Sequence, residues 1–62
     1  MDFTEVIMKR FLMMDRSGKD RMTAEFLTVS EAESEFFNHY GYEPDIIKII
    51  DDMGGVLEVI KE

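Results

Sequence analysis

The chain has 62 residues, of which 14 are acidic and 7 are basic, so its net charge at pH 7 is −7. A chain of this length forms one domain at most and buries only about 60% of its unfolded surface. It contains no Cys and a single His, which excludes disulfides and thiolate-bound zinc and leaves little for any other metal site. We therefore expect a single domain over residues 1–62 with no cofactor or metal. It should be a binding protein and not an enzyme, stabilised by a partner or a second copy.

The hydrophobic fraction of 45% is that of a folded domain. No apolar run approaches the roughly 20 residues that span a bilayer, and the N-terminus lacks the pattern of a secretory signal. These features predict a cytoplasmic protein with no membrane partner. The negative charge also repels DNA and RNA, so direct nucleic-acid binding is not expected.

The charge is distributed unevenly along the chain. Residues 9–21 carry five basic and two acidic side chains, whereas residues 22–62 carry ten acidic and two basic ones. An acidic surface usually keeps a small domain soluble. The other interpretation is a surface that imitates the phosphate backbone and occupies the basic groove of a nucleic-acid-binding protein.

The N-terminal half predicts two strands joined by a tight loop. Residues 3–14 alternate between two partly apolar sides, which favours a strand covered on both faces, with a helix as the alternative. A hairpin loop is expected at 15–20, where Gly18 can adopt a positive φ. Residues 21–29 alternate again, so the two segments should form an antiparallel hairpin. Its several methionines predict irregular core filling or a pliable docking surface.

A helix is predicted from Ser30 to His39 or Tyr40. Ser30 and Glu33 have the spacing of a capping box, in which the hydroxyl accepts a backbone N–H and the carboxylate reaches back. Gly41 should end the helix by adopting the left-handed conformation.

The faces of this helix differ in character. One face is expected to carry Ala32, Phe36 and either His39 or Tyr40, and a neighbouring face Phe37 and Tyr40. Three acids are expected to crowd the other side: Glu31, Glu33 and Glu35. Such carboxylates are natural surrogates for phosphates, because both accept hydrogen bonds from the same basic and amide donors.

The C-terminal segments are short and apolar. The four isoleucines of residues 45–52 favour a strand, whereas the start at Pro44 would also suit one or two helical turns. We favour the strand, because the hairpin needs a third strand beside it. A turn is predicted at 54–55 and a last strand at 56–61. The expected fold is α+β, a small antiparallel sheet with one helix in the order β-β-α-β-β.

Catalytic chemistry is not indicated by these residues. His39 lies beside Tyr40 near a helix end, where a histidine is more often a capping or surface group than a base. Paired acids such as Asp51 and Asp52 are present, but carboxylate catalysis needs two contrasting environments within a formed cleft, for which so small a chain offers little room.

Four short strings of this sequence occur in a distinctive order and spacing: Asp15 to Lys19, Leu27 to Glu31, Tyr40-Gly41, and Asp45 to Lys48. In that order they resemble the small uracil-DNA glycosylase inhibitors of Bacillus phages, over most of the chain. The resemblance implies an acidic homodimer that imitates DNA in the groove of a host glycosylase, in the cytoplasm of an infected cell. An apolar helix residue would enter the pocket of that enzyme's DNA-wedging leucine.

Four features depart from the family pattern. The predicted helix is about one turn longer, and the second strand lacks the tyrosine run of the family. Residues 56–61 are an addition, and Ala32 occupies the position of the family's inserting Phe. That role then passes to Phe36 or Phe37, one turn further on. The contact residues implied for the glycosylase are Glu31, Glu33, Glu35, Phe36, Phe37 and Tyr40. The alternatives are a DNA-mimic inhibitor of another target, such as a CRISPR nuclease, a restriction enzyme or a nucleoid protein, and a small dimerisation module.

Overall fold

The structure of the protein is a computed structural model that describes residues 7–62; the predicted start of the first strand, at 3–6, lies outside the described residues. The elements are β1 (Lys9–Met14), β2 (Arg21–Phe26), α1 (Val29–Tyr40), β3 (Ile46–Ile50) and β4 (Val56–Lys61). The strands form one antiparallel sheet in the order β2-β1-β3-β4. The predicted α+β fold in the order β-β-α-β-β is confirmed.

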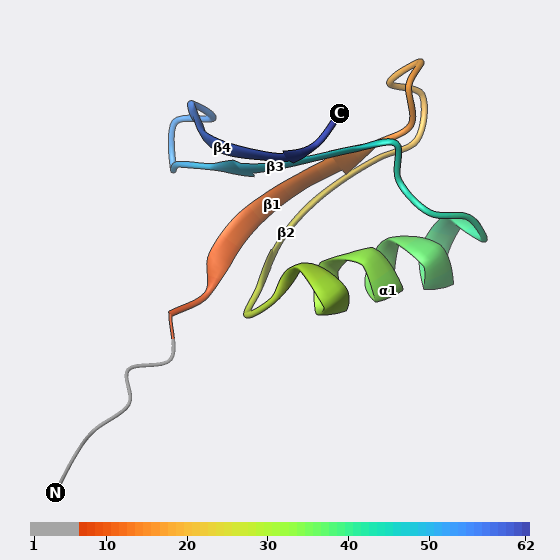
Figure 1. Cartoon of the computed structure of the whole chain (residues 1–62), viewed down its shortest axis with the longest axis horizontal. Coiled ribbons are helices and arrows are strands. Elements are labelled where there is room, and N and C mark those ends of the chain that lie inside the picture. The colour runs from red at the N-terminus through yellow and green to blue at the C-terminus, as the bar shows by residue number, and fades with distance from the viewer. Residues whose placement is uncertain (1–6) are drawn as a thin grey trace, which may run out of the picture.

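The helix packs on one face of the sheet, beside β2 (Figure 1). Alternate residues of β1 point to opposite faces. Phe11 and Met13 are buried, whereas Arg10, Leu12 and Met14 are half-buried. The prediction that this strand is covered on both faces is wrong, because within residues 7–62 no helix or second sheet packs on the face that carries Leu12.

The core lies between α1 and the helix-facing side of the two central strands. It consists of Phe11, Met13, Ala32, Phe36, Ile47 and Ile49. Phe11 lies opposite Ala24 of β2 and opposite Ile49 of β3. Since directly opposed residues of antiparallel strands share a face, the register brings these side chains together under the helix.

The loop between β1 and β2 is the predicted hairpin loop. The backbone N–H of Asp15 donates to the carbonyl of Asp20 over 3.0 Å, and Gly18 has a φ of 78°. The second strand ends at Phe26 and not at the predicted Val29, because the chain leaves the sheet to cap the helix.

The N-cap of the helix lies two residues earlier than predicted. Thr28 is the N-cap: its backbone is extended, and its hydroxyl accepts the N–H of Glu31 over 3.1 Å. The prediction that Ser30 is the cap is therefore wrong, because Ser30 lies in the first turn. Gly41 ends the helix as predicted, with a φ of 85° and an N–H that donates to the carbonyl of Phe37 over 2.7 Å.

The alternatives for residues 45–52 resolve to a strand, Ile46–Ile50. Its pairing with β1 buries Ile47 and Ile49 against the helix side. The last strand, predicted at 56–61, is also confirmed.

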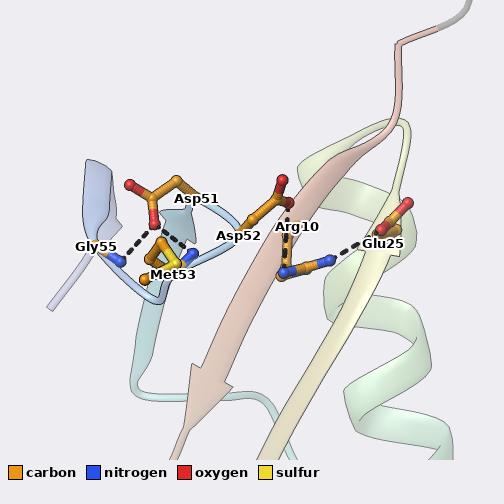
Figure 2. A network of polar contacts seen from close by, with 6 residues as sticks. All are labelled: Arg10, Glu25, Asp51, Asp52, Met53 and Gly55. Atoms are coloured by element: carbon orange, nitrogen blue, oxygen red, sulfur yellow. Dashed lines mark hydrogen bonds and ion pairs between the residues drawn. The ribbon is translucent and has the colours of Figure 1, made fainter.

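The turn between β3 and β4 is organised by Asp51 (Figure 2). One of its carboxylate oxygens accepts the backbone N–H groups of Met53 and Gly55, over 2.9 and 2.7 Å. Gly54 has the positive φ of 85° that the turn requires. The next residue, Asp52, is fully exposed apart from an ion pair of 3.6 Å with Arg10.

We expect Asp51→Ala to lower the free energy of unfolding by about 1–2 kcal/mol, because two backbone donors lose their acceptor. Asp52→Ala removes the same charge but only an exposed ion pair, so the expected loss is below about 0.5 kcal/mol. Urea unfolding followed by circular dichroism measures both variants. Equal losses would contradict the role of Asp51 in the turn.

Candidate functional site

Phe36 and Tyr40 lie on the side of α1 that faces the sheet. Phe36 is fully buried, with its ring centroid 4.7 Å from that of Tyr40 and 5.6 Å from that of Tyr42. The hydroxyl of half-buried Tyr40 donates to the carbonyl of Arg21 over 2.7 Å. These contacts fasten the C-terminal half of the helix to β2 and leave Phe36 no surface for a partner.

Phe37 points away from the core. Successive residues of a helix are about 100° apart, so the burial of Phe36 turns its neighbour outwards. The side chain of Phe37 is 51% exposed. It lines a groove of about 300 Å³ together with Ser30, Glu33, Ser34, Asn38 and Glu43.

The groove combines an outer row of the helix with the turn that follows it. Ser30, Ser34 and Asn38 are four residues apart and therefore lie above one another on the helix. Glu43 approaches from the turn after Gly41. One surface thus combines the polar side chains of this row, the ring of Phe37 and the carboxylates of Glu33 and Glu43.

The acids of the helix fall on two flanks. Glu31 and Glu35 are four residues apart on one flank, whereas Glu33 lies about 200° around the helix from Glu31, in the groove beside Phe37. The prediction that all three crowd one side is therefore wrong. Within residues 7–62 the ion pairs involve Arg10 with Glu25 and with Asp52, so none of the helix glutamates is held in an ion pair.

A hydrogen-bond network joins the β1–β2 loop to the turn after α1. The Tyr42 hydroxyl donates to the Asp20 carboxylate, which, with burial and the charges of Asp15 and Asp45, raises the pKa of Tyr42 far above its ordinary value. The Ser17 hydroxyl donates to Asp15 over 2.7 Å, and this bond, with backbone N–H donors of the loop, lowers the pKa of Asp15. The network holds Tyr42, and so the neighbouring turn of the groove, against the hairpin.

Other kinds of site find little support in the described chain. His39 is exposed, with its ring edge-to-face on Tyr40 at 4.6 Å. Among residues 7–62 no group of three His, Asp or Glu side chains is arranged to hold a metal ion. The same range contains no helix of the length and apolar character that a bilayer crossing requires. The outer face of α1, which carries the groove beside Phe37, is the candidate site.

Of the six predicted contact residues, Phe36 and Tyr40 face the sheet, and the other four do not. The exposed or half-exposed members, on the outer flanks of α1, are Glu31, Glu33, Glu35 and Phe37. Ser34, Asn38 and Glu43 also line the groove and were not among the predicted contact residues. The four-residue spacing from Ser30 to Ser34 and Asn38 is a usable signal, whereas the approach of Glu43 depends on how the turn folds back.

Comparisons of the chain with protein-family models, with curated proteins and with solved structures give no match. The resemblance to phage glycosylase inhibitors therefore rests on the four short strings of the sequence.

The two adjacent phenylalanines should respond differently to truncation. Phe36→Ala empties the centre of the core and is expected to lower the free energy of unfolding by about 3–5 kcal/mol, enough to unfold much of so small a domain. Phe37→Ala should lower it by less than about 1 kcal/mol, because half of its side chain is already in water. Thermal unfolding of both variants tests the assignment, which a reversed order would overturn.

The loop network predicts a pH-dependent stability. The pKa of Asp15 lies below its ordinary value of 3.8, so its bonds stabilise the fold above that pH, and the contribution is lost as the pH falls through the lowered pKa. Ser17→Ala should raise the pKa of Asp15 towards 3.8 and destabilise the protein at pH 7. At acid pH Asp15 is protonated in both the wild type and the variant. The difference between their free energies of unfolding should therefore be smaller than at pH 7. Urea titrations at both pH values, with carboxyl NMR of Asp15, measure the effect; a difference independent of pH would contradict it.

Proposed function

We propose that the protein is a phage-type inhibitor of uracil-DNA glycosylase that acts as a DNA mimic, in the cytoplasm of an infected host cell. The observation that carries the proposal is the outer face of α1, where carboxylates that form no ion pair within residues 7–62 flank a half-exposed aromatic ring. The order of the four family-like strings supports the same target.

The helix spaces its carboxylates in a way that suits phosphate imitation. Glu31 and Glu35 are separated by about 6 Å along the helix axis. A separation of this size is comparable to the direct distance between neighbouring phosphates of one DNA strand. Because neither carboxylate is paired within residues 7–62, both can accept hydrogen bonds from the basic side chains and amides of a DNA groove.

Phe37 is the anchor in this proposal, in place of the buried Phe36. Its exposed half-ring stands beside Glu33 and Glu43 in the groove of α1. An aromatic anchor surrounded by charged groups is the usual composition of an energetic centre in tight interfaces. It would occupy the apolar pocket of the glycosylase that receives the DNA-wedging leucine.

The proposal includes three further points. The protein acts by occupying its target and not by catalysis, it binds no nucleic acid directly, and it forms a homodimer. The alternative target is another nucleic-acid enzyme with a basic groove, because an acidic face alone does not select one.

The test is inhibition of uracil excision by a bacterial uracil-DNA glycosylase. We expect the wild-type chain to inhibit, and the inhibition to weaken as salt is raised, since screening reduces attraction between exposed charges. The triple variant Glu31→Gln, Glu33→Gln, Glu35→Gln should bind at least about tenfold more weakly, which corresponds to roughly 1.4 kcal/mol. Phe37→Ala should lose a similar amount.

A matched control separates position from net charge. The triple variant Glu25→Gln, Asp52→Asn, Glu62→Gln changes the net charge equally but leaves α1 intact, and it should inhibit almost as the wild type does. No inhibition by the wild type would refute the glycosylase as target. Binding of the wild type to a CRISPR nuclease, a restriction enzyme or a nucleoid protein instead would favour the alternative. Equal losses from the two triple variants would refute the role of the helix.

A further inference from the structure

The strand β4 forms an open edge of the sheet (Figure 1). The opposite edge, β2, has α1 beside it, whereas nothing within the described chain lies along the outer side of β4. Its side chains Val56, Leu57 and Val59 are 53%, 66% and 49% exposed. An edge with unpaired backbone groups and exposed apolar side chains is a template for pairing with another strand.

The register of β4 assigns its side chains to faces in an unusual way. Val59 lies opposite Lys48, on the face away from the helix, whereas Glu58 lies opposite Ile49, on the helix side. Lys61 lies opposite Ile47, which is also on the helix side, because the register shifts by one residue between Val59 and Lys61. Glu58 and Lys61 thus share a face although they are three residues apart.

This shift makes the edge complementary to itself. Let a second copy pair antiparallel with β4 about a two-fold axis normal to the sheet at Val59. Val59 then meets Val59 of the second copy. One step outwards, Glu58 lies opposite Lys61 of the second copy when residue 60 is skipped at this edge as it is in the pairing with β3. By symmetry the same charge pair forms on the other side of the axis.

We propose that the protein dimerises through antiparallel pairing of β4 with β4 of a second copy, centred on Val59. The pairing continues the sheet to eight strands, satisfies the open edge and brings the Val59 side chains of the two copies into contact. It specifies the homodimer included in the proposed function by naming its surface.

The second copy is favoured over a foreign strand by charge and by backbone shape. Irregular pairing and charged side chains on an edge usually discourage other strands. A second copy carries the same register shift, so its Lys61 lies opposite Glu58. A strand without the shift would place at that position a side chain that belongs to the other face of the sheet. Lys61 donates to the carbonyl of Pro44 over 2.8 Å, and the remaining protons of its ammonium group stay available.

Charge reversal tests this register on the protein alone. Sedimentation equilibrium of the wild type should detect a dimer at millimolar or lower protein concentration. Glu58→Lys places two like charges opposite each other at both symmetry-related positions and should weaken dimerisation at least about tenfold, as should Lys61→Glu. The double variant Glu58→Lys, Lys61→Glu restores opposite charges and should recover most of the affinity.

The matched control is Asp52→Lys, which makes the same charge change at an exposed residue of the turn, outside β4. It should leave the dimer unchanged, and circular dichroism checks that every variant is folded. If the single variants do not fold, dimerisation of the double variant alone tests the register. A monomeric wild type, or a double variant no better than the single ones, would overturn the proposal. A monomeric wild type would also remove the homodimer from the proposed function, whereas inhibition of the glycosylase, which is not present here, is tested separately.

Discussion

The rotation of α1 about its own axis is fixed by the burial of Phe36 between the helix and the sheet. With Phe36 and Ala32 in the core, the 100° between successive residues turns Phe37 outwards and separates Glu31 and Glu35 from Glu33. A rotation by one residue would expose Phe36 and bury Phe37, and it would break the aromatic contacts with Tyr40 and Tyr42. The composition of the outer face is therefore a consequence of one core contact.

Much of the fold follows from local pattern, because strands and turns in this chain have strong local signals. The alternation in the two N-terminal strands, the left-handed Gly41 and the turn at residues 54–55 each specify their own geometry. Local pattern alone does not decide the conformation of Ile46–Ile50, because the start at Pro44 also suits a helix. It becomes a strand through its long-range pairing with β1. The cap was misassigned because Thr28-Glu31 and Ser30-Glu33 have identical spacing, and the exit of the chain from β2 decides between them.

The site was less predictable than the fold, for a physical reason. Adjacent phenylalanines at 36 and 37 are equally apolar, so sequence alone does not fix the rotation of the helix; packing against Tyr40 and Tyr42 does. Glu43 enters the groove because the turn after Gly41 is tied back to the β1–β2 loop through Tyr42 and Asp20. That tie joins segments 22 residues apart, and no local pattern contains it.

The two proposals concern opposite edges of the sheet, and this makes them mutually compatible. The helix lies beside β2, and β4 lies three strands away, roughly 14 Å at the usual strand spacing. Pairing at β4 would therefore leave both copies of the acidic face of α1 uncovered. It would also keep most of the negative charge of the two copies apart, since β4 itself carries one acid, Glu58, and one base, Lys61. An interface at the helix would instead bring Glu31 and Glu35 of two copies together, against their mutual repulsion. Electrostatics thus favours an association that hides the apolar edge and presents the acids to a basic partner.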